Sequence, residues 1–167
     1  YMNKVKNYDN EHQFLTDKAP LNFRWIGVIK ILFPNSKIVH CNRSAKDNCL
    51  SLYKNSFDDG LDWTYNQTNL IQFYKGYEDI MQFWHRTIPG YIHNVDYEEL
   101  IDNPKKNIEN LLEFCDLSFE ERCLEFYKNK RPIKTVSAAQ AREPLYNSSV
   151  SSYKNYEEFM GGFFSKL

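Results

Sequence analysis

The chain has 167 residues, of which 42% are hydrophobic and 16% aromatic. This is enough apolar material for one packed domain over residues 1–167, which excludes an intrinsically disordered chain. Its 21 basic and 22 acidic residues leave a net charge of −1, so the charge balance gives no general attraction to nucleic acid or to an anionic membrane. No apolar run is long enough to span a bilayer, and residues Tyr1–Gln13 have the character of neither a signal peptide nor a transit sequence.

The first half of the chain alternates extended and helical patterns. Gln13–Asp17 is a short apolar-centred run that predicts a strand. Asn22 is a candidate N-cap for a helix that reaches Phe33, and apolar residues on two of its faces predict a largely buried helix. Lys37–Cys41 is rich in β-branched and apolar residues, as is typical of a buried strand.

A second helix is expected from Ser44 to about Phe57, directly after this strand. Ser44 and Asp47 have the spacing of a capping box, with Asp in place of the usual Glu. The remaining elements are a long amphipathic helix over Thr68–Thr87, a strand over Tyr91–Val95, a helix opened by Pro104, a short helix over Glu120–Tyr127, and a helical end over Tyr153–Leu167 that is interrupted at Gly161–Gly162. Strands that alternate with helices predict an α/β fold, with a partial parallel sheet flanked by helices on both faces.

The four cysteines show none of the spacings that zinc sites use. They are Cys41, Cys49, Cys115 and Cys123, and each has apolar neighbours. We therefore expect four reduced, buried thiols in a cytoplasmic protein, and no metal site.

Polar residues follow the predicted strands, where ligands of open α/β sheets bind. They are Lys18, Arg43 and the pair Asp96–Tyr97. Arg43 directly precedes a predicted helix, so its guanidinium, the free N–H groups of the helix start and the helix dipole would meet at one point. This arrangement predicts a phosphate site.

Ser51 lies two turns along the same helix, on the face of Ser44 and Asp47, so its hydroxyl could join that site. The alternative is that Arg43 pairs with Asp47 or Glu98 and that Ser51 is polar surface.

The histidines are weaker candidates. His40 and His93 fall within strands, where we expect packed and hydrogen-bonded side chains rather than ligands. His85 and Arg86 end the long helix, where they could face an acceptor site; the interpretation that we favour is that their positive charge complements the helix dipole.

Segments along nearly the whole chain resemble the sulfotransferase family, in order and at natural spacing. They are Asp17–Phe23, Ile26–Gly27, Leu32–Arg43, Asp47–Tyr53, Tyr97–Leu100, Asp102–Pro104, Phe114–Cys115, Thr135–Tyr146 and Ser148–Val150. The resemblance is closest to bacterial sulfotransferases that are often fused to tetratricopeptide repeats, which are similar to tyrosylprotein sulfotransferases. It implies a P-loop-like fold and transfer of a sulfonyl group from 3′-phosphoadenosine-5′-phosphosulfate (PAPS) to a hydroxyl.

The resemblance also implies roles for individual residues. Arg43 and Ser51 would hold the 3′-phosphate of the nucleotide. Lys18 would stabilise charge on the sulfonyl group and the leaving phosphate; its alternative is a surface lysine. Tyr97 would contact the nucleotide, with a core aromatic as the alternative. Ser137 and Lys154 fall in the late loop that closes over the nucleotide in the family.

Several positions depart from the family pattern. No glycine lies in the setting of the family's glycine-rich phosphosulfate loop, and the helix that carries the acidic base has no counterpart, so we expect an N-terminally truncated domain without its first strand. Asn55 stands where tyrosylprotein relatives have an arginine. Ser151–Tyr153 stands where a Gly-Arg-Trp-like segment is common, and Arg43–Ser44 where Arg-Asp is common.

The sequence therefore predicts part of a sulfotransferase domain. Its partners would be a nucleotide co-substrate and a hydroxyl acceptor, for which a protein tyrosine is one candidate, with no metal and no nucleic acid. The alternatives are a non-catalytic nucleotide-binding or interaction fragment of the same fold, and a kinase-like P-loop enzyme, which the absence of a Walker lysine disfavours.

Overall fold

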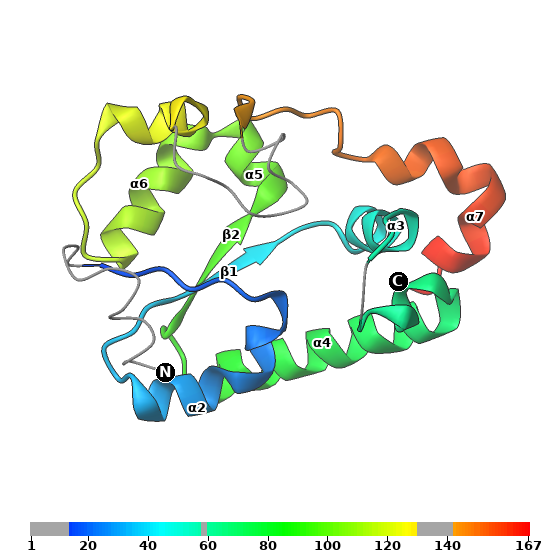
Figure 1. Ribbon diagram of the computed structural model, residues 1–167, viewed down its shortest axis with the longest axis horizontal. Helices are drawn as coiled ribbons and strands as arrows, with labels where there is room; N and C mark the ends of the chain where they lie inside the picture. Colours follow the sequence, from blue (N-terminus) through cyan, green and yellow to red (C-terminus); the bar gives the residue numbers. More distant parts are fainter. Residues whose placement is uncertain (1–13, 58–59, 130–141) are drawn as a thin grey trace.

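Two parallel strands form the centre of the computed structural model, which describes residues 14–57, 60–129 and 142–167. Strand β1 (Ile38–Asn42) pairs with β2 (Ile92–Asp96) from Ile38 opposite Ile92 to Asn42 opposite Asp96 (Figure 1). Both predicted strands are confirmed to within one residue at each end. Because the strands are parallel and in register, their carboxyl ends meet at one edge of the sheet.

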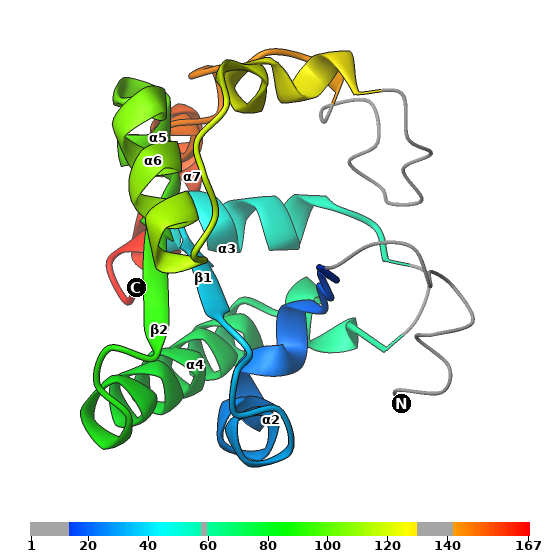
Figure 2. The same cartoon turned by 90° about the vertical axis from the view of Figure 1, so that its left-hand side faces the viewer.

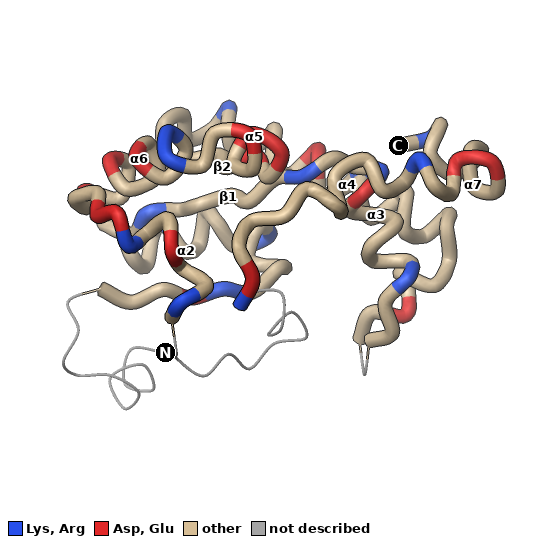
Figure 3. The backbone as a smooth tube through the Cα atoms, turned by 90° about the horizontal axis from the view of Figure 1, so that it is seen from above, with Lys and Arg blue, Asp and Glu red and all other residues tan. Residues whose placement is uncertain are grey.

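The strand expected over Gln13–Asp17 is wrong for the part that the structure describes. Residues 14–19 have no regular secondary structure, and Phe14 and Leu15 are 58% and 54% exposed. The segment lies on the side of β1 away from β2 (Figures 2 and 3). It forms no strand because its apolar side chains find no face to cover, so β pairing gains nothing there.

Helices cover both faces of the sheet, as predicted. On one face Ile92 packs with Met81 of α4 (Gln67–Thr87) and with Ile26, while on the other the His93 ring stacks on Phe114 at 5.0 Å. Phe114 ends α6 (Pro104–Phe114), which has Pro104 in its first turn, as predicted, and follows α5 (Tyr97–Asp102). The sequence pattern predicts no helix over α5, which begins directly where β2 ends.

Helix α4 is the longest element, and its predicted start and amphipathic character are confirmed. Asn66 caps it by accepting the N–H of Asn69 at 3.0 Å, and Leu70, Tyr74 and Met81 are buried along one side. It joins two clusters of buried side chains, one under the sheet and one at the far end of the molecule.

The segment before β1 differs from the prediction. It starts with a 3₁₀ turn, η1 (Pro20–Trp25), with Pro20 rather than Asn22 at its start, and continues as α2 (Ile26–Leu32). Ile26 is buried, but the residues of the second apolar face are exposed: Trp25 (56%), Val28 (48%), Ile31 (80%) and Leu32 (64%). The helix is therefore not largely buried, since the sheet and α4 cover only one of its faces.

The end of the chain packs against α3 (Ala45–Lys54) and α4. Two 3₁₀ helices come before it in the chain, η2 (Asp62–Tyr65) and η3 (Glu121–Lys128), and η3 confirms the short helix predicted over Glu120–Tyr127. The last two elements are η5 (Ser152–Tyr156) and α7 (Glu157–Phe164). Phe163 and Phe164 are buried with Cys49, Leu50, Leu70 and Tyr74. The helical break lies at Met160 (φ −125°), not at the two glycines.

Two further predictions concern burial and membranes. All four cysteines are free thiols, as predicted. The prediction that all four are buried is wrong, since only Cys49 is buried and Cys41 is exposed. No helix in the described ranges is long and apolar enough to cross a membrane.

Candidate functional site

The parallel register brings Arg43 and Tyr97 to the same edge of the sheet. Asn42 and Asp96 end the two strands as partners, and Asn42 Nδ2 donates to Asp96 Oδ1 at 2.8 Å. Arg43 and Tyr97 are the next residues of the two strands, and the Arg43 guanidinium carbon lies 5.3 Å from the centre of the Tyr97 ring. The two side chains thus form a cation–π pair where the sequence predicted an anion site.

The hydrogen-bonding capacity of the Arg43 guanidinium is only partly used. One terminal nitrogen donates to the carbonyl oxygen of Ser149 at 2.6 Å, whereas Nε is buried and has no partner within the described part of the chain. An unpaired buried donor costs on the order of 1–3 kcal/mol, and more when it is charged. An anionic oxygen within reach of Nε would remove that cost and form a charge-assisted hydrogen bond.

Among the described residues, neither carboxylate considered as a partner of Arg43 binds it. Glu98 instead accepts the backbone N–H of Ser44 at 3.0 Å, and so occupies one of the free donors at the start of α3. Asp47 accepts three hydrogen bonds from the segment Ser151–Tyr153. The capping box is wrong for the same reason, since Asp47 is engaged elsewhere and the Ser44 side chain caps nothing.

Ser51 lies two turns along α3 and is partly buried. Asn55 Nδ2 donates to its carbonyl oxygen at 2.8 Å and lies 3.4 Å from its hydroxyl oxygen. Asn55, which stands where the resemblance leads us to expect an arginine, therefore contacts Ser51. Because the Ser51 hydroxyl only accepts in this contact, its own proton is available for donation.

Tyr97 connects the end of β2 to a late segment of the chain. Its hydroxyl donates to the carbonyl oxygen of Tyr146 at 3.3 Å and lies 3.4 Å from the Ser149 hydroxyl. Burial raises the pKa of Tyr146, the neighbouring Tyr97 raises it further, and Arg43 opposes the shift. Tyr146 and Ser149 were not predicted as site residues, because their only sequence signal was membership of the segments that carry the resemblance.

Comparison with known proteins decides the family. The model of the sulfotransferase family matches residues 1–121, well over half of the chain. The chain belongs to the sulfotransferase family.

Two relatives show how much of a longer protein this sulfotransferase chain covers. It is 37% identical over 163 residues to an uncharacterized protein of Aquifex aeolicus (strain VF5), a match that covers 96% of this chain and 21% of the relative. It is 28% identical over 116 residues to a Caenorhabditis briggsae protein named "Putative protein-tyrosine sulfotransferase", covering 68% of this chain and 41% of that one. The chain thus spans about a fifth and two fifths of these relatives.

Two other residues predicted for the site, Lys18 and Lys154, make no contact with Arg43 within the described part of the chain. Lys18 is exposed on the segment beside β1 and makes no hydrogen bond or ion pair within the described residues. Lys154 is exposed in η5, which packs against α3. Ser137 lies outside the described residues.

His40 is hydrogen-bonded in the strand, as predicted. Its Nδ1 lies 2.9 Å from the Asn94 side-chain oxygen, and its Nε2 contacts the Tyr77 hydroxyl. Burial lowers the pKa of His40, whereas burial raises the pKa of Tyr77 to about 12. Both groups are therefore neutral at pH 7, which suits a packing role.

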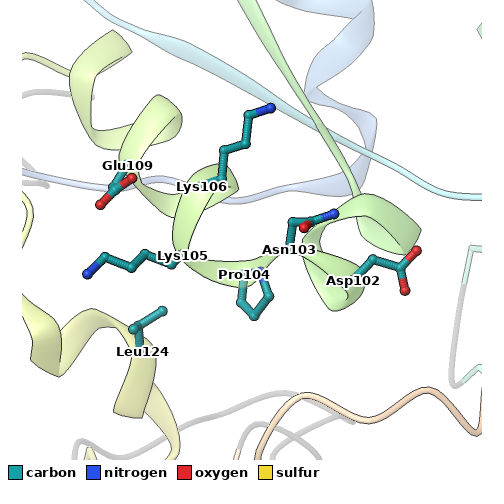
Figure 4. A pocket seen from close by; sticks show the side chains of 7 residues that line it. All are labelled: Asp102, Asn103, Pro104, Lys105, Lys106, Glu109 and Leu124. Atoms are coloured by element: carbon teal, nitrogen blue, oxygen red, sulfur yellow. The ribbon is translucent and has the colours of Figure 1, made fainter.

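A hollow of about 470 Å³ lies away from these residues, where α5 meets α6 (Figure 4). The side chains that line it carry both signs of charge: Asp102, Asn103, Pro104, Lys105, Lys106, Glu109 and Leu124. Lys105 is bound to Glu121 at 2.9 Å, so its charge is already paired. In the described ranges, no three His, Cys, Asp or Glu side chains are grouped so as to hold a metal ion.

Proposed function

We propose that this chain is the nucleotide-binding part of a PAPS-dependent sulfotransferase domain, with residues 1–167 in one unit. Arg43 carries the proposal, since its buried Nε finds no acceptor among the residues that the structure describes and its guanidinium lies against Tyr97 at the carboxyl edge of the sheet. In this proposal Arg43 and Ser51 bind the 3′-phosphate of the nucleotide. Membership of the sulfotransferase family supports this ligand class.

The remaining site residues complete the proposal. Tyr97, Ser137 and Lys154 contact the nucleotide, and Lys18 stabilises negative charge on the sulfonyl group and the leaving phosphate, for which a flexible ammonium is suited. The positive side chains supply the electrostatic stabilisation, so the reaction needs no metal. The acceptor is a hydroxyl, with a protein tyrosine as the first candidate, and the protein is cytoplasmic.

Calorimetric titration with 3′-phosphoadenosine-5′-phosphate tests the site. Arg43→Ala should weaken binding at least tenfold, about 1.4 kcal/mol, because it removes a charge-assisted contact to phosphate. Arg86→Ala, which removes a cation at the end of α4, is the matched control and should bind as the unaltered chain does. Equal affinity in Arg43→Ala would contradict the assignment.

A non-catalytic nucleotide-binding fragment remains a second candidate, because of where the glycines lie. None of the six occupies a turn between a strand and the helix that follows it: Gly27, Gly76, Gly161 and Gly162 are in helices, and Gly60 and Gly90 are in turns with positive φ. Such a turn would cradle the phosphosulfate. Incubation with PAPS and a tyrosine peptide separates the two functions. A non-catalytic fragment would bind the nucleotide without transferring the sulfonyl group, whereas sulfonyl transfer that Lys18→Ala abolishes would establish an enzyme.

A further inference from the structure

We infer that Asp47 is a positioning residue for the anion site: it holds the segment Ser149–Tyr153 in the place from which Ser149 orients the Arg43 guanidinium. This rests on the proposed nucleotide-binding role of Arg43. Asp47 itself need not touch the nucleotide.

The first step is the set of bonds that Asp47 makes. Its side chain is 1% exposed and accepts the N–H of Ser151 at 2.7 Å, the hydroxyl of Ser152 at 3.0 Å and the N–H of Tyr153 at 2.9 Å. All three donors come from one turn at the other end of the chain. A buried carboxylate is tolerated when hydrogen bonds replace its lost hydration, and this turn supplies them.

The second step is the conformation of that turn. Ser151 has φ +56° and ψ +21°, in the left-handed region that residues other than glycine seldom adopt. In this conformation the N–H groups of Ser151 and Tyr153 and the hydroxyl of Ser152 all reach the Asp47 carboxylate. A conformation of this kind is strained, and the three hydrogen bonds to Asp47 are what compensates for the strain.

The third step links the turn to Arg43. Ser149, two residues before Ser151, accepts from the Arg43 terminal nitrogen at 2.6 Å through its carbonyl, and its hydroxyl lies near that of Tyr97. Arg43 precedes α3 and Asp47 lies in its first turn, so the two side chains bind the segment Ser149–Tyr153 at two points. If Asp47 no longer bound the turn, Ser149 could move, and the Arg43 guanidinium would lose the carbonyl acceptor that orients it.

Asp47→Asn tests this in the full chain. An amide keeps the size of the side chain but offers one acceptor oxygen and places an NH₂ group against the Ser151 or Tyr153 N–H. We expect affinity for 3′-phosphoadenosine-5′-phosphate to fall about five- to tenfold by calorimetry. Ser152→Ala, which removes only the hydroxyl contact, should give a smaller loss in a chain that folds normally. Ser151→Gly in the Asp47→Asn background should recover part of the affinity, since glycine adopts the turn without strain.

A double-mutant cycle separates positioning from a general loss of structure. If Asp47 acts through Arg43, Asp47→Asn should have little further effect on affinity in an Arg43→Ala chain. An unchanged affinity in Asp47→Asn, or an equal loss with and without Arg43, would overturn the inference while the proposed function stands. If the unaltered chain binds no nucleotide, the proposed function fails, and the inference fails with it.

Discussion

Ser151 shows at the residue scale why one departure from the family pattern has a structural cost. Ser151 and Asp116 are the residues other than glycine that have positive φ in the described ranges. The resemblance to the sulfotransferase family leads us to expect a glycine at the position of Ser151, and a left-handed backbone is a conformation that glycine adopts without strain. Ser151 therefore donates its backbone N–H to Asp47 while its own backbone is held in a strained, left-handed conformation.

Substitutions at Ser151 should separate strain from side-chain chemistry. Ser151→Gly should leave the free energy of unfolding unchanged or raise it by up to about 1 kcal/mol, because relief of strain exceeds the entropy that glycine adds to the unfolded chain. Ser151→Val should lower it by more than about 1 kcal/mol, since a β-branched residue is strongly disfavoured at positive φ. Urea titration gives both values, and a fully stable Ser151→Val chain would contradict the strain.

His40 should make stability depend on pH. Burial lowers its pKa below the unfolded value of 6.5, and His85 adds to this, while Asn94 and Asp96 oppose it. The native state therefore binds fewer protons than the unfolded state, so this contribution is present above pH 6.5 and is lost as the pH falls through the folded pKa. We expect urea midpoints to fall more between pH 7 and pH 5 in the unaltered chain than in His40→Gln. Equal pH dependence in the two chains would show that His40 is not the group responsible.

At the scale of elements, α2 and α4 approach closely at one glycine. A Cβ atom on Gly27 would lie 2.7 Å from the Trp84 ring, whose indole N–H donates to the Phe23 carbonyl at 2.8 Å. Gly27→Ala should therefore destabilise the chain by about 1–3 kcal/mol, since the ring must move out of a packed position. Thermal unfolding measures this.

Gly76 provides the matched control within α4. A Cβ atom there meets nothing within 4 Å, so Gly76→Ala should instead stabilise the chain by about 0.5–1 kcal/mol through helix propensity. A destabilising Gly76→Ala, or a harmless Gly27→Ala, would contradict the packing described here.

The elements that the sequence predicted well are those whose signal is local. Helix α4 has an apolar stripe over 21 residues and an N-cap, and the two strands are short apolar runs, so periodicity sufficed. The second face of α2 looked buried because apolar residues resemble core residues whether or not a partner covers them. The sequence predicted that Arg43 and Tyr97 lie where the two strands end, and the structure places them there. The contacts of Ser149 and Asp47 join residues more than 100 positions apart, which no local pattern records.

The whole molecule presents an apolar surface on α2. Trp25, Val28, Ile31 and Leu32 are all about half exposed or more, and adjacent exposed apolar residues favour self-association. Ile31→Lys should lower light scattering from concentrated solutions without loss of folding. Ile26→Lys, on the same helix but 3% exposed, should unfold the chain, because it buries an unpaired charge. If Ile31→Lys leaves the light scattering unchanged, the chain self-associates through a surface other than α2.

The bonds from Arg43 and Asp47 to residues 149–153 also constrain the order of folding during synthesis. They join residues 104–106 positions apart, and closure of a loop of that length costs about 5 kcal/mol of chain entropy. At ribosomal rates, roughly 5–20 s separate synthesis of the first partners from synthesis of the last. The sheet and α4 can be in place well before then, while the Asp47 carboxylate still lacks the donors that allow its burial. The proposed anion site would therefore be among the last of these parts to mature, and nucleotide binding would report that the chain has been synthesised through residues 149–153 and that this segment has closed onto α3.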